Sequence, residues 1–345
     1  LVLTIDETIQ YITESALRKA YEKHNAKGAS AIVMDIKTGE ILALANLPTY
    51  NLDEVSKSNT ENRTNRAISY VYEPGSVFKI ITATAALEEE LFVETDEIFC
   101  ENGQYKVSNH ILSDHRPHGT LSFSDVFMVS SNIGVVKIAQ KIGGEQVYKY
   151  GRRFRFGVPT GIDLKGEVSG WLKDPSQWSK TTIGAIPIGY EVTVTPLQLV
   201  SAISALANEG VYMRPFVVKY IKDNQEQIIK SFEPEVVDRV ASPGTAKRVS
   251  EILKSVVQSG TGKRAQIKGV EVSGKTGTAR KVVDGKYSRG KYYASFMGFA
   301  PSDQPRLAMV VVFDEPHPSY FGGTVSAPVF QETMSNALKY LKVSQ

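Results

Sequence analysis

The sequence predicts a mixed α/β (α+β) fold, in which a five-stranded, mainly antiparallel sheet is flanked by helices and joined to an all-helical lobe. Two strand-like segments lie near the N-terminus, three more lie near the C-terminus, and the residues between them carry mostly helical patterns. With 345 residues, of which 42% are hydrophobic and 22% charged, the chain is long enough to bury a large core.

The sheet lobe is expected to combine the two ends of the chain. Its strands are short apolar segments bounded by turn residues, over 29–35, 40–46, 270–273, 292–299 and 307–313. Its helices cover 6–23 and 327–341, and the first has apolar residues at three- and four-residue spacings. Both helices are expected to pack on the sheet.

The helical lobe is expected to lie in the middle of the chain, with loops over 100–120 and 150–190. Its helices are predicted over 76–90, 123–129, 133–142, 195–210 and 245–257. The first is apolar on most sides, which is typical of a buried helix. We therefore predict one discontinuous domain over 1–345, with a sheet lobe at about 1–74 and 255–345, a helical lobe at about 75–254, and a cleft between them.

Charge and cysteine content exclude some classes of protein. The net charge is only +3 and both signs are mixed along the chain, which argues against nucleic acid as a partner. The single cysteine, Cys100, excludes an intrachain disulfide. No apolar run approaches the roughly 18 residues of a membrane span. Because the chain opens on Leu1 rather than Met, we expect any signal or anchor to lie upstream.

The first chemical motif is Ser76-Val77-Phe78-Lys79. A serine hydroxyl becomes a good nucleophile when a base takes its proton, and residues three apart on a helix lie on the same side. Apolar surroundings lower the pKa of a lysine toward that of a working base. The same spacing recurs over Ser288–Lys291, but a glycine and the absence of a helical pattern there predict a strand-connecting turn.

The second motif is Ser130-Ser131-Asn132, between two predicted helices. It offers a hydroxyl that can pass a proton and a carboxamide that can hold a substrate amide. The alternative is a structural N-cap, because serine and asparagine both cap helices well. Taken alone, this motif favours the cap.

The third motif, Lys275-Thr276-Gly277-Thr278, is predicted at the end of a strand. It supplies a cation and two hydroxyls for a carboxylate, and a glycine that lets backbone approach a ligand closely. The same letters occur over Lys37–Gly39, where a tight turn between two apolar strands explains them fully.

The three motifs, in this order, resemble the signature of penicillin-binding proteins and serine β-lactamases. The similarity runs from about Leu3 to Leu341, is greatest to the class B, division-type peptidoglycan D,D-transpeptidases, and is carried by five longer stretches. They are Tyr72–Lys79, Ser130–Gly134, Val194–Leu199, Ser259–Gly262 and Ser273–Ala279. The two-lobed transpeptidase fold of that family agrees with the order of elements predicted above.

The resemblance implies a role for each motif residue. Ser76 is the acylated nucleophile, Lys79 its base and Ser130 a proton relay, while Asn132 holds the substrate amide. Lys275, Thr276 and Thr278 bind the terminal carboxylate, next to Gly277. The backbone N–H groups of Ser76 and Thr278 form the oxyanion hole. The resemblance implies no metal, no cofactor and no deacylating glutamate, so a long-lived acyl-enzyme is expected.

The resemblance also implies partners and a location. The substrates are peptidoglycan stem peptides on glycan strands, and β-lactams are inhibitors. Ser76 attacks the penultimate D-Ala carbonyl, terminal D-Ala leaves, and an amine of a neighbouring stem peptide takes the acyl group. A glycosyltransferase and other division proteins are expected partners. The catalytic domain is expected on the periplasmic face of a bacterial inner membrane, with an anchor and a pedestal domain upstream.

Other readings of the sequence are weaker. Gly269–Thr276 matches the nucleotide-binding Gly-x4-Gly-Lys-Thr pattern, but a phosphate-binding loop opens a helix, and this one reads as strand. We therefore expect no nucleotide. His110, His115 and His118 suggest a metal site but lack further ligands, so solvated loop histidines are favoured.

Two more alternatives remain. The arginines among the aromatic residues of 148–156 suggest RNA or an anionic glycan, although a packed helix end is favoured. The second alternative is a catalytically silent domain of the same fold that senses β-lactams. The presence of every expected catalytic side chain argues against it.

Overall fold

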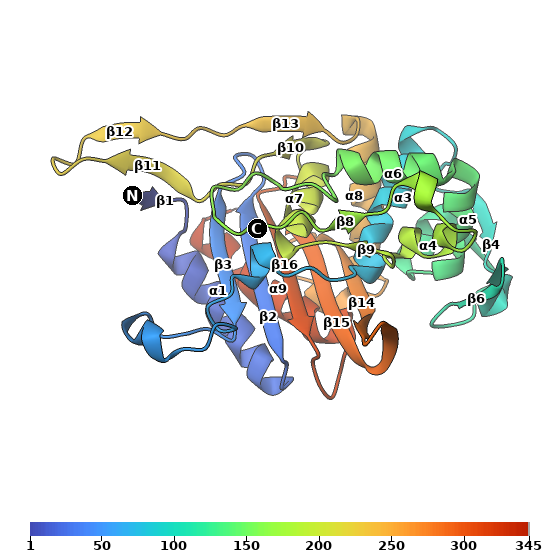
Figure 1. The fold of residues 1–345 in the computed structure, drawn as a ribbon. Helices are drawn as coiled ribbons and strands as arrows, with labels where there is room; N and C mark the ends of the chain where they lie inside the picture. The colour runs from blue at the N-terminus through green and yellow to red at the C-terminus, as the bar shows by residue number, and fades with distance from the viewer. Residues whose placement is uncertain (344–345) are drawn as a thin grey trace.

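In the computed structural model, which describes residues 1–343, a five-stranded antiparallel sheet runs through the molecule (Figure 1). Its strands, in spatial order, are β14 (Ser273–Val283), β15 (Lys286–Ala300), β16 (Leu307–Asp314), β2 (Gly28–Asp35) and β3 (Ile41–Leu47). The N-terminal hairpin joins the C-terminal strands where β2 pairs with β16, with Ala31 opposite Val311. The predicted fold class and sheet are confirmed.

Helices cover both faces of this sheet. The helices α1 (Glu7–Lys23) and α9 (Gly322–Tyr340) share one core with Met309, Val311 and Phe313 of β16. The intervening residues of β16 belong to a second core on the opposite face, which includes α7 (Pro196–Ala207). Successive strand side chains point to opposite faces, so a strand covered on both sides reads as a continuous apolar run.

The second core continues into a group of helices beside β14 (Figure 1). These helices are α3 (Lys79–Glu88), α4 (Phe123–Met128), α5 (Asn132–Ile142), α6 (Gly144–Arg153) and α8 (Pro243–Gln258). All nine residues of α3 from Lys79 to Leu87 are buried, as its apolar pattern predicts. The helix α7 begins after the capping box of Thr195 and Gln198, at the start of the helix predicted over 195–210.

Two stretches predicted as loops contain regular structure. Residues 97–122 hold four short strands, β4 (Glu97–Phe99), β5 (Gln104–Val107), β6 (His110–Ser113) and β7 (Thr120–Ser122). The helix α6 extends past the predicted loop boundary at 150 and starts directly after α5. Gly143 ends α5 with a φ of +86°, as a terminating glycine does, but buried Val147 and Tyr150 anchor a new helix at once.

The predicted position of the strand that carries the third motif is wrong. The strand β14 begins at Ser273, where the predicted strand ends, and continues to Val283, so Lys275 lies in its first half and not at its end. Ser288 lies inside β15, and the turn is at 284–285. Glycines disfavour strands, which hid β14 in the sequence. Here a Cβ at Gly274 would come within 2.5 Å of Phe296.

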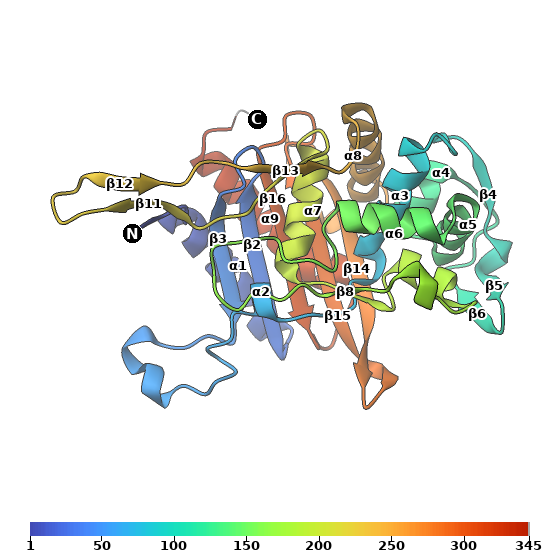
Figure 2. The same ribbon diagram turned by 45° about the horizontal axis from the view of Figure 1, so that its top comes forward.

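Smaller elements surround the sheet and the group of helices. The strands β1 (Val2–Leu3), β11 (Val218–Lys222) and β12 (Ile228–Ser231) form an arm that projects from the sheet (Figure 2). The others are α2 (Arg66–Ser69), β8 (Trp171–Leu172), β9 (Val192–Thr193), β10 (Val211–Met213) and β13 (Val236–Arg239). Among residues 1–343, no helix is long and apolar enough to cross a membrane, and no cluster of three or more acidic, histidine or cysteine side chains suits a metal.

Candidate active site

The three predicted motifs meet between β14 and the helical group. Lys79 Nζ lies 3.2 Å from Ser130 Oγ, and Lys275 Nζ lies 2.9 Å from the same oxygen. Ser76 lies one turn before Lys79, in a 3₁₀ turn over Gly75–Phe78 that leads into α3. Lys79, Ser130 and Lys275, which are 51 to 196 positions apart in the sequence, thus form one continuous polar cluster at the edge of the sheet that β14 makes.

The turn around Ser76 differs from the predicted α-helix. The Lys79 N–H donates to the Ser76 carbonyl, so the two residues are separated by one 3₁₀ turn, in which side chains three apart lie on the same side. Gly75 has a φ of +58°, and its N–H donates to Gly189 across 3.1 Å. A Cβ at Gly75 would come within 3.0 Å of the Thr278 carbonyl. Glycine therefore lets the nucleophile turn lie against β14.

Lys79 is fully buried and has three oxygen neighbours. Its Nζ lies 2.7 Å from the Ser130 carbonyl and 2.8 Å from Asn132 Oδ1, besides the contact with Ser130 Oγ. Burial lowers the pKa of Lys79 well below its usual value, Lys275 lowers it further, and Asp114 opposes the shift. A neutral amine has two N–H groups, which the carbonyl and the carboxamide accept. Its lone pair then remains free for a hydroxyl proton.

Ser130 is the residue that connects the two lysines. Its backbone has a φ of +63°, which costs free energy in a residue other than glycine and is frequent at functional sites. Lys275 donates to Ser130 Oγ, so the hydroxyl proton is free to point toward Lys79. Burial lowers the pKa of Lys275 to about 7. Within residues 1–343, Ser76 Oγ makes no hydrogen bond with a side chain of this cluster, so the nucleophile is not yet engaged.

The N-cap alternative for the second motif applies to its middle residue. Ser131 accepts the N–H of Gly134 across 2.9 Å and caps α5, which leaves Ser130 and Asn132 to face Lys79. The carboxylate of Asp114 accepts the Ser131 hydroxyl across 2.6 Å and also the Asn132 N–H. Asp114 therefore holds the motif in place. No local pattern in the sequence points to Asp114, because only the folded chain brings this loop residue next to α5.

The third motif has side chains on both sides of β14. Lys275 faces the helical group, whereas Thr276 Oγ lies 2.7 Å from Thr261 Oγ. The hydroxyl of Thr278 accepts the N–H of Gly322 across 3.1 Å, at the start of α9, so its own proton is free to donate to a ligand. Thr261 and Gly322 thus support the motif, and neither stood out as a site residue in the sequence.

Gly277 and the Thr278 backbone lie against the nucleophile turn. A Cβ at Gly277 would come within 2.3 Å of Ser295 Oγ and 3.0 Å of the Pro74 carbonyl, so glycine lets the strand lie this close to the turn. The Thr278 carbonyl points toward Gly75. In an antiparallel strand the N–H and C=O of one residue point to the same side, so the Thr278 N–H also points toward the turn. An oxygen placed there would face two backbone donors, because the first N–H groups of a helix have no internal partner.

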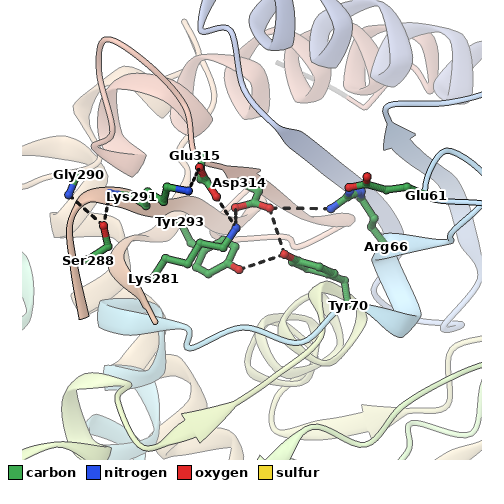
Figure 3. Close-up of polar contacts among 10 residues, drawn as sticks. All are labelled: Glu61, Arg66, Tyr70, Lys281, Ser288, Gly290, Lys291, Tyr293, Asp314 and Glu315. Atoms are coloured by element: carbon green, nitrogen blue, oxygen red, sulfur yellow. Dashed lines mark hydrogen bonds and ion pairs between the residues drawn. The ribbon is translucent and has the colours of Figure 1, made fainter. Parts of the chain in front are cut away.

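The two motif look-alikes lie elsewhere. Lys37 is part of a turn in which Asp35 accepts its N–H across 2.9 Å, and its Nζ contacts Asn208. Ser288 Oγ accepts the backbone N–H groups of Gly290 and Lys291 on the exposed part of β15 (Figure 3). No helix follows Lys275-Thr276, because β14 continues for seven more residues to Val283. The nucleotide-binding interpretation is therefore wrong.

A second group of charged side chains lies further along β14 (Figure 3). Lys281 Nζ lies 2.7 Å from both Asp314 and Glu315. Asp314 also accepts the hydroxyl of Tyr70 across 3.1 Å and lies 4.0 Å from Arg66. Tyr70 belongs to the segment that leads into the nucleophile turn, so this group connects that segment to β14 and β16.

The arginine-rich segment over 148–156 forms a packed helix end, which is the alternative that the sequence favoured. Tyr150, Phe154 and Phe156 are buried, and the Arg152 guanidinium donates to the carbonyl of Gly157 across 2.9 Å. The aromatic side chains therefore face the core rather than a nucleic acid.

Comparisons with known proteins match this architecture along almost the whole chain. Residues 29–335 match the family model described as the penicillin binding protein transpeptidase domain. The chain is 37% identical over 346 residues to stage V sporulation protein D of Bacillus subtilis, which covers 99% of this chain and 54% of that protein. It is 35% identical over 346 residues to the peptidoglycan D,D-transpeptidase FtsI of Escherichia coli, covering 99% of this chain and 56% of that protein.

Solved structures give the same match. Penicillin binding protein 3 of Mycobacterium tuberculosis, complexed with aztreonam, has a TM-score of 0.93 and 32% identity over 99% of this chain and 79% of that one. The apo transpeptidase domain of Burkholderia pseudomallei penicillin-binding protein 3 has a TM-score of 0.87 and 34% identity, covering 99% and 97%. The chain spans about half the length of several curated relatives that it matches.

Proposed function

Since the chain belongs to the penicillin-binding protein transpeptidase family, we propose that it is a serine peptidoglycan D,D-transpeptidase with Ser76 as its nucleophile. The observation that carries this proposal is the Lys79–Ser130–Lys275 contact beside Ser76. A neutral lysine, a bridging hydroxyl and a buried cation are the groups that acyl transfer from a carboxylate-ended peptide requires.

In the proposed acylation step, the Lys79 amine takes the Ser76 proton as Ser76 Oγ bonds to the penultimate D-Ala carbonyl carbon. The resulting oxyanion accepts hydrogen bonds from the N–H groups of Ser76 and Thr278. The proton then passes through the Ser130 hydroxyl to the leaving nitrogen, the C–N bond breaks, and D-Ala departs. Because one lysine first accepts and then donates the proton, the net charge of the cluster is the same before and after the step.

Substrate binding divides between the remaining motif residues. The terminal carboxylate is proposed to lie between Lys275 and the hydroxyls of Thr276 and Thr278, and Asn132 Nδ2 to hold the peptide amide. An incoming carboxylate raises the pKa of Lys275 and keeps it charged while substrate is bound. In the second step the amine nitrogen of a neighbouring stem peptide bonds to the ester carbon, the bond from that carbon to Ser76 Oγ breaks, and the proton lost by the amine passes through the cluster to Ser76 Oγ.

A β-lactam fits the same proposal, because its amide lies one residue from a carboxylate and its acyl group stays attached to Ser76. The proposed place of action is the extracytoplasmic face of a bacterial inner membrane, in cell division. A glycosyltransferase and other division proteins are proposed as partners, with glycan strands as the polymeric substrate. The resemblance of the motif stretches to division-type transpeptidases supports a role in division.

The test is labelling with a fluorescent penicillin, followed by peptide mapping of the adduct. We expect one adduct, on Ser76, and none in Ser76→Ala. Ser288→Ala is the matched control, because it removes the other serine of a Ser-x-x-Lys match, and it should label like the wild type. An adduct on Ser288, or no adduct after long incubation, would refute the assignment.

A further inference from the structure

A cavity of about 230 Å³ lies at the opposite edge of the sheet from Ser76. Its walls are α1, the outer edge of β3 and the loop between β3 and α2, which stands away from the sheet in Figure 2. We call this space the edge cavity. It has room for roughly seven waters at about 30 Å³ each, so it suits one or two small residues rather than a whole folded segment.

The outer edge of β3 is covered at Leu42 and at Leu44, before the strand reaches this cavity. Outward-facing Leu42 accepts the backbone N–H of Asp6 across 2.9 Å. Two residues on, Leu44 exchanges two hydrogen bonds with the side-chain amide of Gln10, at 2.8 and 3.1 Å. This amide occupies the position that a neighbouring strand would take. Free strand edges bind other chains readily, and covering them is the usual protection.

Asn46 is the next outward-facing residue, and its backbone is open. Because Leu44 points its N–H away from β2, the alternation of antiparallel pairs points the N–H and C=O of Asn46 outward too. Neither group has a protein partner within residues 1–343. The Asn46 side chain is already used, since Oδ1 accepts from Ser30 and Ala67 and Nδ2 donates to Asn65. One donor and one acceptor of a strand therefore face the edge cavity.

Two arginines line the same cavity without a counterion. Among the described residues, neither Arg18 nor Arg63 forms an ion pair, and Arg63 reaches only the Thr60 hydroxyl at 3.5 Å. Nearby Arg66, in contrast, is paired with Glu61 at 2.8 Å. The carboxylate of Glu14, which also lines the cavity, is hydrogen-bonded to Gln10. Guanidinium groups match carboxylates in charge and geometry.

We propose that the edge cavity is a second, non-catalytic binding site for the carboxylate end of a peptidoglycan stem peptide. One residue of the peptide pairs with the Asn46 backbone as an added strand, and its terminal carboxylate binds Arg18 and Arg63. The choice of ligand rests on the proposed function, which places the protein among peptides that end in small residues and a free carboxylate. A second site holds the polymer near Ser76 and raises its effective concentration.

The test uses the full chain after acylation by penicillin, so that the Ser76 cleft is blocked. Titration calorimetry measures binding of a synthetic pentapeptide ending in D-Ala-D-Ala and of its C-terminal amide. We expect the peptide acid to bind the wild type. Its C-terminal amide should bind with a Kd about tenfold higher or more, and Arg18→Met and Arg63→Met should each raise the Kd of the acid by a similar factor. Arg289→Met, which removes an exposed arginine of β15, is the matched control and should bind like the wild type.

A second readout tests the backbone contact. Bound acid should slow amide hydrogen exchange at Asn46, whose N–H is otherwise open to water, and leave the Leu44 amide unchanged. The proposal is overturned if the acid and the amide bind equally well, or if neither Arg18→Met nor Arg63→Met changes the Kd of the acid. Tighter binding of an all-L peptide acid, which would point to a protein tail, also overturns it. If penicillin acylates Ser76 but the peptide acid does not bind at the edge cavity, the proposed function stands and only the second site is refuted. If Ser76 is not acylated, the proposed function is itself refuted.

Discussion

The strand β14 carries two lysines whose surroundings have opposite effects on their charge. Lys275 is buried with Ser130 Oγ as its side-chain neighbour, and burial lowers its pKa to about 7. Lys281 lies six residues further along, where Asp314 and Glu315 each approach it to 2.7 Å, and its pKa is raised despite burial. Two lysines on one strand therefore differ in charge: Lys275 loses its proton readily near pH 7, whereas Lys281 stays charged.

The difference lies in the counterions rather than in burial alone. Without a carboxylate, a buried ammonium loses hydration and gains little, so the neutral form is favoured. With two carboxylates the charge is compensated, and the pair connects secondary structure elements, as Figure 3 shows for Lys281. Lys79 belongs to the first type, because its hydrogen-bond partners are neutral oxygens. The site thus contains lysines suited to exchanging protons or receiving an anion, and the Asp314 group contains a lysine suited to holding structure.

The largest effect is expected from Lys79. Lys79→Ala removes the proposed base, and acylation by a fluorescent penicillin should slow by at least ~10²-fold. The far-ultraviolet circular dichroism spectrum should stay that of the wild type, because alanine favours helix at this first position of α3. An acylation rate within a few-fold of the wild type would mean that another group takes the Ser76 proton.

Lys281 should show the opposite behaviour, with an effect on stability. Lys281→Met leaves Asp314 buried beside Tyr70 and Arg66 only, and breaking a buried pair on one side costs about 3 kcal/mol of unfolding free energy. Urea denaturation measures this cost. Lys286→Met is the control on the same hairpin, where the lysine is exposed, and should change stability by less than about 0.5 kcal/mol. Equal effects of the two changes would show that the Asp314 group holds nothing together.

Lys275 should combine lost activity with unchanged or improved stability. Lys275→Met removes the cation for the substrate carboxylate, so acylation should fall by about ten- to a hundredfold. Lys37→Met, in the look-alike Lys-Thr-Gly turn, should leave the rate unchanged. If both variants lost activity equally, the proposed carboxylate site would lie elsewhere.

The stability of this variant should depend on pH with a defined sign. The folded pKa of Lys275 is about 7 and its ordinary value is 10.5, so the unfolded chain binds more protons between these pH values. Burial of charged Lys275 therefore destabilises the wild type fully below pH 7, and this loss of stability fades as pH rises toward 10.5. Lys275→Met should therefore raise Tm relative to the wild type at pH 6, and the gain should shrink by pH 10. A gain that grows with pH would contradict the assigned direction of the pKa shift.

The sequence predicted the parts of the fold that have a strong pattern. Fully buried β2 and β16 read as apolar runs, and α7 lies within the helix predicted over 195–210. It missed β14 as the site strand because Gly274 and Gly277 look unfavourable in a strand. Their missing side chains make room for Phe296 and for the nucleophile turn, a reason that exists only after folding.

The candidate site was predicted unevenly for a similar reason. Ser76, Lys79, Ser130, Asn132 and the residues of 275–278 were identified from their motifs, and the structure brings them together. The partners that hold the motifs were not identified. Asp114, Thr261 and Gly322 act through long-range contacts with single atoms, which leave no periodic or local trace in the sequence. The lobe boundaries and the roles of the site residues stay predictions.

The smallest effect expected concerns how substrate preference changes with pH. At pH 6 a thioester substrate with a free carboxylate should acylate the protein about ten- to a hundredfold faster than its amide, because a charged Lys275 binds only the acid well. Protonation of Lys79 at low pH slows both substrates equally, so it cancels in the ratio. As pH rises above about 7, Lys275 in the empty site loses its charge, and the ratio should fall by a few-fold by pH 9. The fall is smaller than it would be if the pKa of Lys275 stayed the same on binding, because the bound carboxylate favours the charged lysine. Stopped-flow acylation with both substrates across this range measures the ratio, and Lys275→Met should give a low ratio with no pH dependence. A ratio that stays constant across this range would mean that Lys281, the lysine of this strand that stays charged, or another permanently charged cation, binds the carboxylate instead.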